Sequence, residues 1–170
     1  HSKYGYLKKY IDNKDGNPSA NWFEQFPLQE IAEAEKRLGF QFPSQLKEFW
    51  EEIGYGFLRS TNKSIGKHTT LVNRIMPPDD IRDFLLLKEE SGIILPEAAE
   101  MLEPGYMPFF EIEGCWSFLF MRPLSNNPNA VYTVVGEKVE DSFERFIYRL
   151  YYESPTFYDE IDLKKDEDDI

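Results

Sequence analysis

The chain has 170 residues and a formal net charge of -12, with 41% hydrophobic and 16% aromatic residues. This length suits one domain with a substantial core, and the negative charge disfavours binding to nucleic-acid phosphates. No stretch approaches the roughly 20 apolar residues of a membrane-spanning helix, no signal-peptide pattern opens the chain, and one cysteine excludes an intrachain disulfide framework. We therefore expect a cytoplasmic protein that binds neither membranes nor nucleic acid and is suited to a basic partner protein.

Residues 1–27 are expected to form an N-terminal arm. A short helix over residues 3–12 would carry apolar side chains on one face, and turn-forming residues after it predict a loop. Trp22, Phe23 and Phe26 follow, just before the first long helix. These aromatic residues favour packing of the arm across the domain, and an aromatic patch that binds a partner is the alternative.

Two helices joined by a tight corner are predicted next. Ile31, Ala34 and Leu38 give the first helix an apolar face, and Gly39 can adopt positive φ at its end. Pro43 presets φ for the first turn of the second helix. Apolar residues at i, i+3, i+4 and i+7 give the second helix one core-facing stripe. The stripe consists of Leu46, Phe49, Trp50 and Ile53.

The middle of the chain alternates between polar and structured segments. The stretch from Arg59 to His68 is polar and basic, lacks an apolar period, and predicts a loop or a loosely held hairpin. A strand is predicted over residues 70–76, and Pro77-Pro78 would stop it. A helix over residues 79–91 and a short helical piece over residues 95–102 would follow.

Strands dominate the second half. Short apolar or alternating runs separated by turn residues predict three strands, over residues 107–112, 116–121 and 131–135. A closing helix follows, with Asp141 and Glu144 as a candidate capping pair. Its core-facing stripe consists of Phe143, Phe146, Ile147 and Leu150.

The composition changes beyond Tyr152. Residues 153–170 contain eight acidic residues and two lysines, a net charge of -6, and such a run is typically a solvated, mobile tail. Residues 28–152 should then form the folded part. The predicted fold class is α+β, a single domain in which helices pack against a mostly antiparallel sheet.

The order of these elements resembles the SUKH superfamily. SUKH domains open with an isoleucine, a glutamate, a Leu-Gly pair and a Phe-Pro pair, followed by an aromatic helix that ends in a glycine-rich turn. The matching residues in this chain are Ile31, Glu35, Leu38-Gly39 and Phe42-Pro43. Later segments continue the resemblance, over residues 73–77, 104–109 and 142–147. The superfamily includes a yeast cell-wall-synthesis regulator and many bacterial immunity proteins, so the resemblance implies a SUKH-like α+β fold and a binding role.

A catalytic or metal site is not expected. Cys115 and His68 could form a thiolate–imidazole dyad, but Cys115 lies in an apolar strand region, where cysteine usually behaves as a buried hydrophobe. Asp79, Asp80 and Asp83 could suggest a metal site, but unpaired backbone N–H groups favour acids at the start of a helix. The sequence has no phosphate-binding glycine loop, nucleophile elbow or zinc ligand set. We therefore expect neither an enzyme nor a cofactor.

The leading hypothesis is an immunity protein (antitoxin) that binds and neutralises a cognate secreted bacterial toxin, a nuclease. The resemblance implies this function. The net negative charge of the chain agrees with it, because an acidic inhibitor can occupy the basic cleft with which a nuclease attracts phosphate. The alternative is a regulatory protein-interaction scaffold like the eukaryotic cell-wall-synthesis regulators. An enzyme that uses Cys115 or acidic residues is a third hypothesis, and the oligomeric state stays open.

Four residues are the candidate partner contacts. Glu111 and Glu113 lie at a predicted strand end and its turn, which would hold their carboxylates in place. Tyr55 and Phe57 flank Gly56 where the second helix ends, and they would act as desolvated anchors. Packing under the turn is the alternative for the two aromatic residues. The acidic tail would contribute mainly to the association rate.

Overall fold

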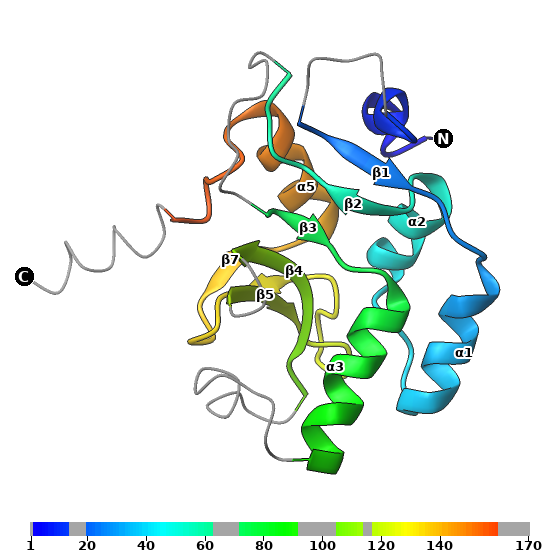
Figure 1. The fold of residues 1–170 in the computed structure, drawn as a ribbon. Helices are drawn as coiled ribbons and strands as arrows, with labels where there is room; N and C mark the ends of the chain where they lie inside the picture. The colour runs from blue at the N-terminus through cyan, green and yellow to red at the C-terminus, as the bar shows by residue number, and fades with distance from the viewer. Residues whose placement is uncertain (1, 14–19, 63–71, 92–104, 114–116, 160–170) are drawn as a thin grey trace, which may run out of the picture.

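A computed structural model describes residues 2–13, 20–62, 72–91, 105–113 and 117–159 (Figure 1). Within these ranges seven strands form one antiparallel sheet, and each strand pairs with the next along the chain. The strands are β1 (Trp22–Glu24), β2 (Tyr55–Phe57), β3 (Arg74–Ile75), β4 (Met107–Glu113), β5 (Ser117–Met121), β6 (Val131–Tyr132) and β7 (Lys138–Glu140). The predicted α+β class with a mostly antiparallel sheet is confirmed.

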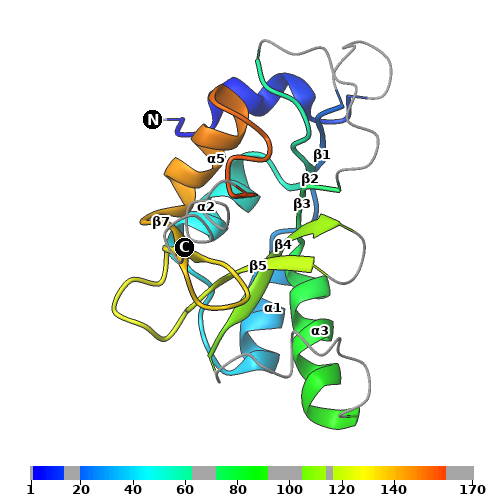
Figure 2. The ribbon, with the colours of Figure 1, turned by 90° about the vertical axis from the view of Figure 1, so that its left-hand side faces the viewer.

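The helices occupy two regions, which are one side of the sheet and the end of the sheet that is lower in Figure 1. They are the 3₁₀ helix η1 (Gly5–Tyr10), α1 (Gln29–Leu38), α2 (Ser44–Glu52), α3 (Pro78–Ser91) and α5 (Phe143–Tyr152). Helices α2 and α5 lie behind β1–β3 in Figure 1 and to one side of them in Figure 2. Helix α3 packs against α1 and β4. No helix in the described ranges is long and apolar enough to cross a membrane.

The inner face of the sheet forms the core. One row of neighbouring residues crosses five strands. The row is Phe23, Gly56, Ile75, Phe110 and Leu119, all buried. Phe23 meets Phe49 of α2 with ring centres 5.8 Å apart, and Phe110 meets Phe146 of α5 at 5.2 Å. The predicted stripes of both helices are fully buried, as expected for core-facing positions.

The corner between α1 and α2 shows why its residues occur in this order. Gly39 takes the left-handed conformation with φ of 81°, which glycine adopts without a steric penalty. The carboxylate of Glu35 accepts a hydrogen bond from the backbone N–H of Phe42 at 2.7 Å and pairs with Lys47 at 3.3 Å. Glu35 therefore fixes the turn from within the preceding helix.

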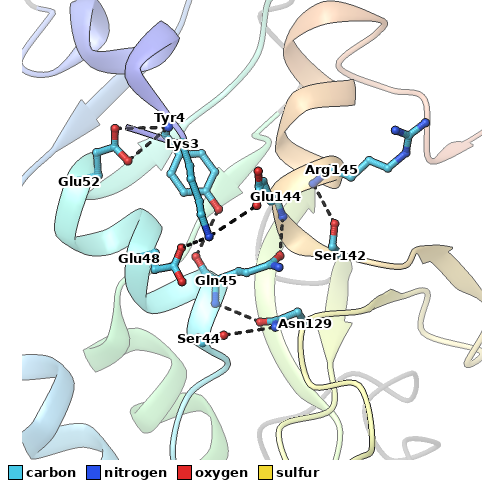
Figure 3. A network of polar contacts seen from close by, with 10 residues as sticks. All are labelled: Lys3, Tyr4, Ser44, Gln45, Glu48, Glu52, Asn129, Ser142, Glu144 and Arg145. Atoms are coloured by element: carbon cyan, nitrogen blue, oxygen red, sulfur yellow. Dashed lines mark hydrogen bonds and ion pairs between the residues drawn. The ribbon is translucent and has the colours of Figure 1, made fainter. Parts of the chain in front are cut away.

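Polar contacts hold the N-terminal segment against α2 and α5 (Figure 3). Lys3 pairs with Glu48 at 2.7 Å and with Glu144 at 3.8 Å, and the backbone N–H of Tyr4 donates to Glu52 at 3.3 Å. The Tyr4 side chain is fully buried. This segment, expected to belong to an arm, is thus packed on the folded part.

The segment after α5 is also packed onto the domain. Pro155, Phe157 and Tyr158 are buried. The Nδ2 of Asn73 donates to the carbonyl of Pro155 at 2.7 Å, and the Tyr158 hydroxyl donates to Oδ1 of Asn73 at 2.5 Å. Packed structure therefore continues beyond residue 152 to at least Tyr158, within the range expected as a tail.

Several predicted elements differ from the structure. Strands β1, β2 and β7 were not expected, because three-residue strands are too short to show an alternating pattern. The predicted capping pair of the closing helix is wrong, since Ser142 is the N-cap and its Oγ accepts from the backbone N–H of Arg145 at 3.1 Å. The helical piece over 95–102, His68 and Cys115 lie outside the described residues.

Replacing Trp50 by alanine should lower the free energy of unfolding by about 3–5 kcal/mol. Its side chain is 1% exposed, its Nε1 donates to the carbonyl of Met76 at 3.0 Å, and its ring centre lies 4.9 Å from that of Phe42. Trp22→Ala is the matched control, because Trp22 is 37% exposed and should cost under about 1 kcal/mol. Equal losses in denaturant melts would contradict this assignment of the core.

Candidate protein-binding face

The outward side chains of the first four strands form one surface. Neighbouring strands align Trp22 with Phe57, Phe57 with Arg74, and Arg74 with Glu111, while Glu24 is aligned with Tyr55. These positions alternate with the buried row, so their side chains point away from α2 and α5. We call this surface the open face and define it as Trp22, Glu24, Tyr55, Phe57, Arg74 and Glu111. In Figure 1 the side of β1–β3 that lies opposite α2 and α5 is turned toward the viewer.

Arg74 is the electrostatic centre of the open face. Its guanidinium contacts Glu111 and Asp80, each with a nitrogen–oxygen distance of 2.5 Å, and lies 5.7 Å from the ring centre of Tyr55. Burial acts to lower the pKa of Arg74, but hydrogen bonds and charge from Asp80 and Glu111 outweigh it and raise the pKa overall. The side chains of Arg74 and Glu111 are only 19% and 17% exposed, so this pair is a fixed part of the surface.

Tyr55 holds a second carboxylate in place. Its hydroxyl donates to Oε2 of Glu24 at 2.9 Å across the β1–β2 pair. This hydrogen bond, with a further contribution from burial, raises the pKa of the Tyr55 phenol. The ring also lies 6.1 Å from that of Phe26. The half-buried Tyr55 thus lies beside a carboxylate that it orients.

An aromatic and cationic corner lies where β1 meets β2. Phe57 is half-buried and is the cross-strand neighbour of the exposed Trp22. The guanidinium carbon of Arg59 lies 4.0 Å from the ring centre of Phe57. Tryptophan, tyrosine and arginine are the side chains most enriched in the energetic centres of protein interfaces. The composition of the open face therefore suits protein binding.

The structure brings together three of the four predicted contact residues. Tyr55, Phe57 and Glu111 lie on the open face, although the aromatic pair belongs to strand β2 and not to a helix end. Glu111 is paired with Arg74 and is not an unpaired surface charge. Glu113 ends β4, where its backbone is aligned with Ser117.

Sequence reasoning did not assign a site role to Arg59 or Arg74. The position of Arg74 between two carboxylates depends on strand pairing between distant segments, which has no local signal. Trp22 did have a local signal. It lies in the aromatic cluster of Trp22, Phe23 and Phe26, for which a patch that binds a partner was the alternative interpretation.

The described residues contain no arrangement suited to metal chemistry. No group of three potential metal ligands occurs among them. Asp80 pairs with Arg74, and Asp79 and Asp83 pair with Arg82. The carboxylates at the start of α3 are therefore engaged by arginines.

A surface hollow of about 410 Å³ lies beside the N-terminal segment. It is lined by Lys3, Tyr6, Ser142, Glu144, Arg145 and Tyr148. Lys3 is paired with Glu48 and Glu144, and Arg145 with Glu140. The first amide groups of α5 donate to Ser142 and Gln45. The charges of the hollow thus already have partners within the protein, which leaves the open face as the stronger candidate.

A family model for the SMI1/KNR4 family (SUKH-1) matches residues 26–156. The chain belongs to this family. It is also 31% identical over 149 residues to "Immunity protein YxxD" of Bacillus subtilis (strain 168), a match that covers 86% of this chain and 92% of that protein. No solved structure matches the chain significantly. Within the SUKH-1 match lie Tyr55, Phe57, Arg74 and Glu111, whereas Trp22 and Glu24 precede it.

Replacing Arg74 by glutamine should lower the free energy of unfolding by roughly 1–3 kcal/mol, because it leaves Glu111 without its ion pair in a half-buried place. The double variant Arg74→Gln/Glu111→Gln should recover part of that loss, as expected for a coupled pair. Arg82→Gln is the matched control, since Arg82 pairs with the more exposed Asp79 and Asp83. Equal losses in the Arg74 and Arg82 variants, with no recovery in the double variant, would contradict this view of Arg74.

Proposed function

We propose that the protein is a non-catalytic immunity protein, an antitoxin that binds and neutralises a cognate secreted bacterial toxin. The observation that carries this proposal is the 31% identity to a protein named as an immunity protein, over most of the length of both chains. Neutralisation would take place in the cytoplasm, a reducing compartment that suits a chain with one cysteine. The protein would act by occupying a surface of the toxin and would need no cofactor.

The proposed toxin is a nuclease with a basic cleft. The chain has a net charge of -12, which attracts a basic protein over distances of about a Debye length and raises the association rate. Steered association can reach about 10⁸–10⁹ M⁻¹s⁻¹ at low salt. A nuclease needs positive charge to bind phosphates, so blocking that cleft would remove its activity.

The proposed contact surface is the open face together with Glu113. Tyr55 and Phe57 would be the desolvated anchors, because both are half-buried aromatic side chains held by neighbouring strands. Glu24 and Glu111 would orient polar groups of the toxin, each being fixed by one partner within the protein. Glu113, at the end of the same strand as Glu111, would extend this polar rim.

The direct test is to isolate the partner from cells of the source organism and to assay neutralisation. The tagged protein should co-purify with a toxin domain whose nuclease activity it abolishes at equimolar ratio. Tyr55→Ala and Phe57→Ala should each weaken binding by about 2 kcal/mol, close to thirtyfold in Kd, while melting curves show that both variants are folded.

Tyr152→Ala is the matched control, because Tyr152 is an exposed tyrosine on α5, away from the open face. This variant should bind like the original protein. Capture of a cell-wall-synthesis enzyme in place of a toxin would instead favour the regulatory scaffold and overturn the proposal.

A further inference from the structure

Arg59 is held in a fixed position at one corner of the open face. Its Nε donates to the carbonyl of Val72 at 3.1 Å, and its backbone N–H donates to Oδ1 of the buried Asn21 at 2.8 Å. Its guanidinium carbon lies over the ring of Phe57, 4.0 Å from the ring centre. Little side-chain entropy is then left to lose when a ligand binds.

Arg59 differs from four other arginines in having no carboxylate partner among the described residues. Arg74, Arg82, Arg145 and Arg149 each form an ion pair with a carboxylate. Among the described residues Arg59 forms none, although it is half-buried and burial lowers its pKa. Such a cation favours an acceptor that arrives from outside.

The neighbouring sequence offers no acidic side chain to Arg59. Between Glu52 and Asp79 the chain contains no aspartate or glutamate, but it contains Arg59, Lys63, Lys67 and Arg74. This stretch of sequence therefore has a net positive charge, although the whole chain has a net charge of -12. Because Arg59 contacts the ring of Phe57, a ligand at this corner of the open face meets a cation and an aromatic ring.

We propose that Arg59 binds a carboxylate on an acidic segment of the partner protein, while Trp22 and Phe57 pack against the same segment. A guanidinium can donate two parallel hydrogen bonds to a carboxylate and remain stacked on an aromatic ring. The inference rests on the proposed function for the identity of the partner as a toxin. The overall charge attracts a basic toxin, and Arg59 selects one that presents an acidic side chain at this corner, since a partner without one would leave the guanidinium desolvated and unpaired.

The first test uses a hexaglutamate peptide as the probe and the full chain as the receptor. In an NMR titration the peptide should shift the Nε–Hε signal of Arg59 and the indole N–H signal of Trp22 saturably, and a hexalysine peptide should not. Arg59→Gln should weaken peptide binding at least tenfold. Arg122→Gln should not change it, and this variant is a matched control because Arg122 is also half-buried, stacks on Tyr106 at 5.0 Å and forms no ion pair among the described residues.

Three results of the titration would overturn the inference. They are the absence of shifts at Arg59, equal effects of the Arg59 and Arg122 variants, and binding that occurs only in a chain truncated after Asp159. The last result would assign the corner to the acidic C-terminal end of the chain itself.

The second test uses the toxin domain captured by co-purification. Arg59→Gln should raise the dissociation rate at least tenfold, and Arg59→Lys should restore only part of the loss, because lysine cannot form the bidentate contact. Arg59→Glu should regain binding to a toxin variant in which the contacted acidic residue is replaced by lysine. Unchanged dissociation in Arg59→Gln would reject the inference and leave the proposed function intact. If no toxin is captured while the peptide binds through Arg59, the proposed function fails and the carboxylate site stands.

Discussion

The close approach of strand β1 to strand β2 is the constraint on which the open face depends. A Cβ atom at Gly54 would lie 2.0 Å from the carbonyl oxygen of Glu24, and one at Gly56 would lie 2.1 Å from that of Trp22. Both glycines also have positive φ, at 119° and 148°. Only glycine fits here, and this fit lets β1 place Phe23 in the core and Trp22 and Glu24 on the opposite face.

The two faces of the sheet thus have different roles, because neighbouring residues of the same strand alternate between the core and the open face. On its inner face, aromatic side chains interlock with those of α2 and α5, and this packing fixes the strands. On its outer face, the strands present paired charges and half-buried rings from a rigid support, which is the arrangement that protein binding favours. Arg74 pairs with Glu111 and Asp80 there, so the open face contains charges of both signs, while the net negative charge of the chain acts at long range.

The sequence predicted the elements whose pattern is local. The closing helix and the helix with Trp50 were predicted because their apolar residues recur with the helical period over several turns. Strands β1 and β2 were missed because three residues hold no readable period, and Gly54 and Gly56 look like turn residues unless the neighbouring strand is known. Tyr55, Phe57 and Glu111 were chosen for separate local reasons. Their assembly around Arg74 arises from pairing across β2, β3 and β4, which only the folded chain shows.

The central claim is that the open face is the surface that meets the toxin, and hydroxyl-radical footprinting of the protein alone and in its complex with the captured toxin domain tests it most directly. Oxidation of Trp22, Tyr55 and Phe57 should fall in the complex. Oxidation of Tyr148 and Tyr152, which are 49% and 36% exposed on α5, should stay unchanged. Protection of the two α5 tyrosines, with Trp22 oxidised as fast as in the free protein, would contradict the account.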